Sequence, residues 1–246
     1  MLLKEDSVAT GAWLFRWRSY LPLVLIAVII PAFEKFSYPF GSHAYDLTWE
    51  LLCFTISLAG LAIRGYTIGY APAGTSGRNT KSQRAETLNT TGIYSITRNP
   101  LYLGNFFMML GASMFVRVWW VSLIYLLAFG LYYERIIMAE ESFLEGQFGR
   151  QYANYARRTP AFVPRFSLWR PNVIPFSFRN VLKREYSGLF GLIAAFTTLE
   201  LIGDYRIEGR VVWDPVWVVL FLFGLLTYIV LRTLKKKTHW LRVEGR

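Results

Sequence analysis

Residues 101–133 read LYLGNFFMMLGASMFVRVWWVSLIYLLAFGLYY, and Arg117 is the only charged residue among them. A membrane-spanning helix needs about 20 predominantly apolar residues. This stretch divides near Arg117 into two apolar blocks, which predict a helical hairpin inside a membrane. The hairpin places the chain in the membrane class.

Four further apolar blocks lie at 19–33, 47–70, 186–203 and 212–231. Only 17% of the 246 residues are charged and the mean hydropathy is +0.30, whereas soluble domains carry about a quarter charged residues. The sequence therefore predicts an all-α polytopic membrane helix bundle of about six spans (five to six), with a cytoplasmic helix after the fourth span.

The first block, 19–33, is short and contains Pro22 and Pro31. A re-entrant or interfacial segment is the alternative to a true span. No small-residue cleavage site follows the block, so we expect it to be retained and not to act as a signal peptide.

The chain is strongly basic, with a net charge of +11 and a pI near 9.8. Lysine and arginine concentrate before the first block, between the second and third, between the fourth and fifth, and after the sixth. This spacing follows the positive-inside rule and predicts that both termini are cytoplasmic. Nucleic acid is disfavoured as a partner, because the basic residues lie between apolar blocks and not on one polar face. Membrane lipids are the expected partners.

Metal binding is not predicted. Cys53 is the only cysteine, and His43 and His239 are far apart in sequence, so no disulfide and no paired zinc or haem ligands are expected. A stretch rich in Gly, Thr and Ser at 71–83 predicts a flexible loop, which is a candidate lid.

A helix start is predicted at Asn99-Pro100, because Asn is a preferred N-cap and Pro is preferred at the first helical position. Gly104 and Gly111 follow on one close-packing face. The positive end of such a helix, with Arg98 beside it, is suited to binding an anion. The alternative is an ordinary capped membrane helix.

Two adjacent carboxylates, Glu140 and Glu141, follow the fourth block on a helix that leaves the membrane. Carboxylates at a membrane boundary are costly unless they are paired or functional. Glu145 is expected to face solvent, whereas the motif resemblance described below favours a function for Glu140 and Glu141. Gly146 and Gly149 are expected to interrupt this helix.

The motifs RNPLYLG at 98–104, EESFLEGQFGRQYANY at 140–155 and VPR at 163–165 resemble the isoprenylcysteine carboxyl methyltransferase and phospholipid methyltransferase superfamily. The usual pattern is R-H-P-x-Y-x-G and then E-E-x-x-L-x-x-x-F-G-x-x-Y-x-x-Y. The chain departs from it at Asn99, where the family usually has His. The resemblance covers 92–165, within a predicted core at 90–166 that is flanked by membrane regions 1–89 and 167–246.

The resemblance implies an S-adenosylmethionine pocket where the two motifs meet, with a helical hairpin between them. Arg98 and Glu141 are the implied catalytic residues. The implied cofactor-binding residues are Tyr94, Arg98, Asn99, Tyr102, Leu103, Glu140 and Glu141. Basic residues that follow the second motif are candidates for holding an anionic headgroup, with membrane anchoring as the alternative: Arg157, Arg158 and Arg165.

The predicted function is methyl transfer from S-adenosylmethionine to a lipid or lipid-linked acceptor, with an anionic lipid headgroup favoured by the basic face. A protein prenylcysteine carboxylate is the runner-up. The alternative class is a non-catalytic membrane transporter or scaffold of the same fold, for which the intramembrane charges Glu50, Arg64 and Glu200 argue.

Overall fold

The computed structural model describes residues 3–72 and 86–243, which form helices and connecting turns with no β-strand among them. The all-α prediction is confirmed for this part of the chain. The helices are α1 (Leu3–Trp17), α2 (Leu21–Ala32), α3 (His43–Gly69), α4 (Pro100–Met114), α5 (Trp119–Phe148), α6 (Arg150–Arg158), α7 (Phe178–Glu208) and α8 (Pro215–Lys237).

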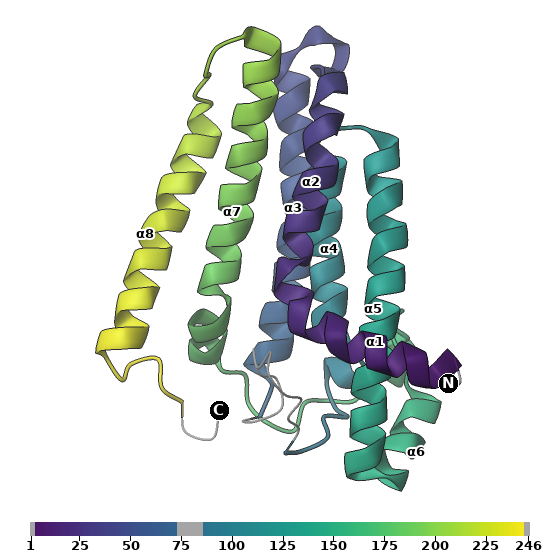
Figure 1. Ribbon diagram of the computed structural model, residues 1–246. Helices are drawn as coiled ribbons and strands as arrows, with labels where there is room; N and C mark the ends of the chain where they lie inside the picture. Colours follow the sequence, from purple (N-terminus) through teal and green to yellow (C-terminus); the bar gives the residue numbers. More distant parts are fainter. Residues whose placement is uncertain (1–2, 73–85, 244–246) are drawn as a thin grey trace.

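Four helices are long and apolar enough to cross a membrane, namely α3, α5, α7 and α8. They run side by side in an upright bundle together with the shorter α2 and α4 (Figure 1). Apolar side chains such as Leu222, Phe223 and Leu226 of α8 are more than half exposed, as expected for residues that face lipid. The chain is therefore an integral membrane protein, and the count of six spans stays a prediction.

Helices α3 and α4 pack through glycines, which allow two backbones to approach closely in a membrane. A Cβ atom on Gly60 would lie 2.4 Å from the carbonyl oxygen of Gly104, and one on Gly111 would lie 2.2 Å from the carbonyl oxygen of Cys53. The close-packing face predicted at Gly104 and Gly111 is confirmed. Since α3 also packs on α7, it joins the N-terminal, motif-bearing and C-terminal parts of the bundle.

Helix α5 continues through Glu140 and Glu141 to Phe148, and Gly149 ends it. Gly149 has a φ of 51° and a ψ of −125°, a conformation that is open to glycine and costly for other residues. The chain turns there into α6. The interruption predicted at Gly149 is confirmed, whereas the one predicted at Gly146 is wrong, because Gly146 lies within α5.

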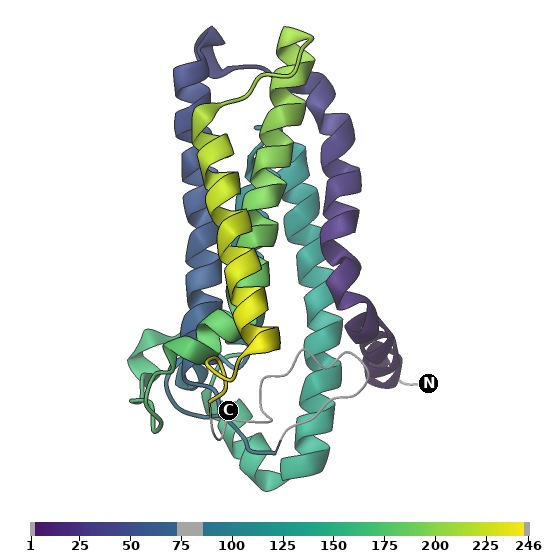
Figure 2. The same ribbon diagram turned by 90° about the vertical axis from the view of Figure 1, so that its left-hand side faces the viewer.

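Helix α1 was not predicted from the sequence. It lies across one end of the bundle, beside α5 (Figures 1 and 2). The hydroxyl of Tyr132 donates a hydrogen bond to the carbonyl of Leu14 over 2.8 Å. A Cβ atom on Gly11 would lie 2.0 Å from the carbonyl oxygen of Arg135, so the glycine permits this close contact.

The start of α1, the end of α8 and helix α6 all lie at one end of the bundle, called here the motif end (Figure 1). The loops that join α2 to α3, α4 to α5 and α7 to α8 lie at the opposite end. The side of the membrane that each end faces stays a prediction, as does the division into 1–89, 90–166 and 167–246. The loop expected at 71–83 falls outside the described residues from 73 onward.

Candidate functional site

The start of α4 is covered by the segment that follows α6. The backbone N–H of Arg98 donates to Pro160 O over 2.9 Å, and that of Arg165 donates to Ile96 O over 2.9 Å. The Thr97 hydroxyl donates to Phe162 O over 3.0 Å. These bonds bring the two sequence motifs together, as the resemblance implied.

Asn99 holds the N-cap position of α4, but its side chain makes no capping hydrogen bond. Its amide Nδ2 donates instead to Ala161 O over 2.9 Å, while the backbone N–H groups of Tyr102 and Leu103 bond to the Asn99 carbonyl. The predicted helix start is confirmed and the predicted side-chain cap is wrong. The reason is tertiary, because the hydrogen bond to the Ala161 carbonyl fixes the orientation of the Asn99 side chain.

Arg98 connects three elements of the motif end. Its Nε and Nη2 donate to Oε1 of Glu141 over 2.9 and 2.6 Å. Its Nη1 donates to the carbonyls of Ala156 and Thr159 at the end of α6, over 2.6 and 2.7 Å. Four of the five guanidinium N–H groups are thereby engaged within the protein, so this pair holds α4, α5 and α6 together.

Glu140 points toward a group of tyrosines. The hydroxyl of Tyr102 donates to its Oε1 over 2.7 Å, and the ring of Tyr133 lies 4.7 Å from that of Tyr102, centroid to centroid. Burial raises the pKa of Tyr94 to about 12, and the nearby Glu140 carboxylate adds to that increase. Tyr102 and Glu140 therefore lie together at the motif end, where the Tyr94 carbonyl accepts a hydrogen bond from the Tyr155 hydroxyl of α6 over 2.7 Å.

A carboxylate among aromatic rings suits the cationic groups of S-adenosylmethionine, because ring faces and a negative charge both attract a cation. Within the described residues, the second oxygen of Glu140 has no hydrogen-bond partner. The residues present thus fit the cofactor that the resemblance implies.

The other predicted site residues lie around this centre in different settings. Leu103 is buried against the bundle. The three arginines predicted to bind substrate, which are Arg157, Arg158 and Arg165, are exposed at the end of α6 and in the segment after it. They do not contact the Glu140 group, and they face outward at the motif end.

Sequence reasoning missed a polar chain through the bundle. Arg64 of α3 donates through Nε and Nη2 to the two carboxylate oxygens of Glu185 in α7, over 2.9 and 2.7 Å. Its Nη1 donates to Oδ1 of Asn105 over 2.6 Å, and Asn105 Nδ2 donates to the Tyr133 hydroxyl over 3.2 Å. Since the ring of Tyr133 contacts that of Tyr102 at a tilted angle, the chain reaches the Glu140 group.

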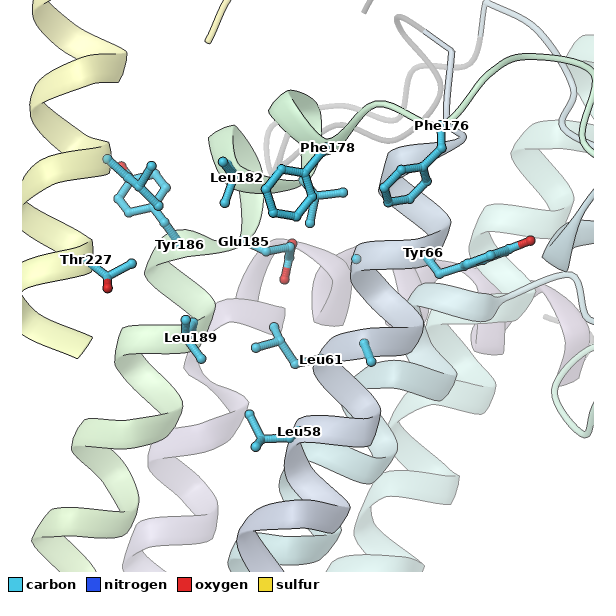
Figure 3. Close-up of a pocket in the computed structure, with 14 residues that line it drawn as sticks. Leu58, Leu61, Tyr66, Phe176, Phe178, Leu182, Glu185, Tyr186, Leu189 and Thr227 are labelled. Carbon is cyan, nitrogen blue, oxygen red and sulfur yellow. The ribbon is translucent and has the colours of Figure 1, made fainter. Parts of the chain in front are cut away.

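This polar chain begins at an apolar cavity of about 480 Å³ between α3, α7 and α8. Figure 3 shows the Glu185 carboxylate pointing between α3 and α7, with Leu58, Leu61 and Leu189 beyond it. Phe176 and Phe178 line the wall near the motif end. The signal in the sequence was Arg64 within an apolar block, because an intramembrane charge predicts a buried partner.

Comparison with known proteins agrees with this geometry. The family model described as phospholipid methyltransferase matches residues 66–151, which run from the cavity through the first motif and into the second, ending at the start of α6. A protein-S-isoprenylcysteine O-methyltransferase of Schizosaccharomyces pombe is 31% identical over 34% of this chain and 36% of its own length. No solved structure gave a significant match.

Two bacterial relatives match over more of the chain. The cobalt-zinc-cadmium resistance protein CzcN of Cupriavidus metallidurans is 37% identical over 63% of this chain and 64% of its own length. The nickel-cobalt-cadmium resistance protein NccN of Alcaligenes xylosoxydans xylosoxydans is 34% identical over 67% of this chain and 70% of its own length. The match with CzcN thus spans less than two thirds of that protein. The phospholipid methyltransferase model and the Schizosaccharomyces pombe relative, together with the motifs, show that the chain belongs to the superfamily of isoprenylcysteine carboxyl methyltransferases and phospholipid methyltransferases.

Proposed function

We propose that this protein is an integral membrane S-adenosylmethionine-dependent methyltransferase that modifies a lipid or lipid-linked acceptor, with an anionic headgroup as the favoured target. The observation that carries the proposal is the apolar cavity between α3, α7 and α8, from which polar contacts lead to Tyr133, whose ring contacts that of Tyr102, the hydrogen-bond donor to Glu140. A cavity of this kind accommodates an acyl or prenyl chain, and Arg64, Asn105 and Tyr133 connect it to the residues proposed to hold the cofactor.

Glu140 is the proposed cofactor-binding carboxylate, with Tyr102 orienting it, and Tyr94 is a further proposed cofactor-binding residue. S-adenosylmethionine supplies, when bound, a methyl group on a positively charged sulfur. Glu141 and Arg98 are proposed as positioning residues and not as catalytic ones, because their side chains bind each other and the end of α6. Their hydrogen bonds fix the start of α4 next to α5.

An anionic acceptor oxygen needs no general base, since it carries no proton that has to be removed as its bond to the methyl carbon forms and the carbon–sulfur bond breaks. The protein has to align this oxygen with the methyl group and exclude water, which is where most of the acceleration of a two-substrate reaction arises. The exposed Arg157, Arg158 and Arg165 at the motif end are proposed to attract the anionic headgroup, while the apolar cavity takes the tail.

A prenylcysteine carboxylate on a protein is the alternative acceptor. It presents the same combination of an apolar chain and an anionic oxygen, so the cavity suits it equally. Incubating membranes that contain the protein with methyl-labelled cofactor, and separating lipids from protein, distinguishes the two. Label in the lipid fraction supports a lipid headgroup, and label in the protein fraction supports the prenylcysteine acceptor.

A second candidate function is a non-catalytic role in metal resistance. It is favoured by the names of the two bacterial relatives, which describe resistance to cobalt, cadmium, zinc or nickel. Titration calorimetry of the purified protein with S-adenosylhomocysteine separates the candidates. A methyltransferase should bind this product, whereas absence of binding would favour the non-catalytic role.

The cavity is tested by filling it. Ala62 lines the cavity on α3, so Ala62→Phe should raise the KM for a lipophilic acceptor at least severalfold and leave S-adenosylhomocysteine affinity unchanged. The matched control is Ala128→Phe, an exposed position on α5 outside the cavity. Equal acceptor KM values for the two variants would show that the cavity does not hold the acceptor.

A further inference from the structure

Five carboxylates gather at the end of the bundle opposite the motif end, from three helices. Asp46 and Glu50 lie on α3, Glu200 and Asp204 lie on α7, and Asp214 is the N-cap of α8. All five are buried, with relative exposures between 0% and 6%. The imidazole of His43, at the start of α3, is 44% exposed and lies where the cluster opens to solvent.

In four of these carboxylates, one oxygen accepts a hydrogen bond from a neighbouring group. The indole of Trp217 donates to Glu50 Oε2 over 2.9 Å, and the hydroxyl of Tyr38 donates to Asp204 Oδ1 over 2.7 Å. Arg117 pairs with Asp46 Oδ1. Asp214 Oδ1 accepts from the first turn of α8, including the Val216 N–H over 2.7 Å.

The remaining oxygens of the cluster are buried and unsatisfied. Among the described residues, Asp46 Oδ2, Glu50 Oε1, Asp204 Oδ2 and both oxygens of Glu200 have no hydrogen-bond partner. The Glu200 side chain is only 2% exposed. Buried carboxylate oxygens without a partner are strongly unfavourable, so a group that satisfies them is expected.

The donor atoms are close enough to share one ion. One atom each from His43, Glu200 and Asp214 lie within 4.8 Å of one another, and so does one atom each from Asp46, Glu50 and Glu200. Glu200 belongs to both groups. The arrangement resembles that of metal ligands, in which one oxygen of a carboxylate is fixed by a neighbour and the other is left for the ion.

Charge balance points the same way. Among the described residues, Arg117 is the one permanently charged cation that contacts the five carboxylates, and it is already paired with Asp46. His43 is the second basic group, 3.7 Å from Asp214 and 4.0 Å from Glu200. A buried group of like charges is stable only if a cation or protons neutralise it.

We propose that this cluster binds one divalent transition-metal cation, with Glu200 as the shared ligand between Glu50 and Asp46 on one side and His43 and Asp214 on the other. Carboxylate oxygens with one imidazole nitrogen suit borderline ions such as Zn²⁺ and Co²⁺. The half-exposed His43 is the entry point. The sequence predicted no metal because it contains no paired His or Cys residues. That prediction did not consider carboxylates that only the fold brings together.

The test uses the full chain in lipid nanodiscs, stripped with a chelator and titrated with Zn²⁺ and with Co²⁺. We expect one Zn²⁺ per chain by mass spectrometry and a Co²⁺ absorption band typical of protein ligands. Glu200→Gln should weaken Zn²⁺ binding at least tenfold, and the control Glu208→Gln, exposed on the same helix, should leave it unchanged. S-adenosylhomocysteine affinity should be the same in both variants, because the cluster lies at the opposite end from the motifs.

His43→Gln provides a variant that leaves the buried carboxylates in place. It should weaken Zn²⁺ binding and change the Co²⁺ spectrum, whereas His239→Gln, at an exposed histidine beyond α8, should do neither. Wild-type Zn²⁺ affinity in both His43→Gln and Glu200→Gln would overturn the proposal. The proposal would also be overturned if the wild-type protein took up no Zn²⁺ and the Glu200→Gln variant melted at a higher temperature than the wild type. That result would mean that Glu50 and Glu200 share a proton.

Discussion

The buried pair of Arg64 and Glu185 allows a structural role to be separated from a functional one. The Glu185 side chain is 6% exposed and that of Arg64 is 17% exposed, and two hydrogen bonds of 2.7 and 2.9 Å join them. Replacing Glu185 with Gln leaves the guanidinium charge buried between α3, α4 and α7. Breaking such a pair by removing one charge costs about 3–5 kcal/mol.

For a chain of this size, each kcal/mol lowers the melting temperature by about 2–4 °C. Glu185→Gln should therefore melt about 6–20 °C below the wild type in a fluorescence-based thermal shift assay. The double variant Arg64→Met with Glu185→Met removes both charges and fills a similar volume. It should recover most of the lost stability, because well-packed apolar residues often replace a buried ion pair without loss.

The methyltransferase activity proposed above should not recover with stability. The pair lies at the meeting point of the apolar cavity and the polar chain to Glu140, so the double variant should remain inactive while binding S-adenosylhomocysteine like the wild type. A stable double variant with full activity would refute the placement of the acceptor beside this pair. A Glu185→Gln variant that melts like the wild type would refute the energetic reasoning itself.

Four further outcomes are expected. Glu140→Gln should weaken S-adenosylhomocysteine binding at least tenfold, about 1.4 kcal/mol. The control Glu145→Gln, at an exposed position on the same helix, should leave the affinity unchanged. Equal affinities of the two variants in calorimetry would show that Glu140 is not part of the pocket. Asn99→Asp should melt below Asn99→Ala, because a carboxylate would face the carbonyl that now accepts from the amide; the opposite order would restore the capping role. Gly60→Ala should destabilise the bundle, since its Cβ would meet backbone atoms at 2.4 and 2.6 Å, and an unchanged thermal shift would contradict this packing. A reporter fused after Arg246 should be active only on the cytoplasmic side, and activity on the outer side would reverse the topology.

The apolar blocks of the sequence predicted the long helices well, because about 20 consecutive apolar residues leave few alternatives to a helix in lipid. Helix α1 could not be predicted in the same way. It is short, it carries charges of both signs, and it depends on contacts with α5 such as the bond from Tyr132 to Leu14. Local pattern is a weak guide where tertiary contacts decide.

The motif residues show a second limit. Local rules predicted a side-chain cap at Asn99 and an anion site beside Arg98, and both side chains are bound instead to residues 156–161. That segment comprises the end of α6 and the residues after it, and it is distant from Arg98 and Asn99 in the sequence. A motif indicates which residues share a site, but only the fold shows which of them face a ligand and which hold one another.

Intramembrane charges show the same limit most clearly. Glu50, Arg64 and Glu200 stood out in the sequence because isolated charges in apolar blocks require partners, and the helix packing supplies those partners in two different ways. Arg64 meets an opposite charge, Glu185, and a cavity adjoins the pair. Glu50 and Glu200 meet each other and further carboxylates, with oxygens left unsatisfied. The first arrangement is complete within the protein and can stabilise it, whereas the second is incomplete until a cation or a proton is added, and this difference is why the second is proposed as a binding site.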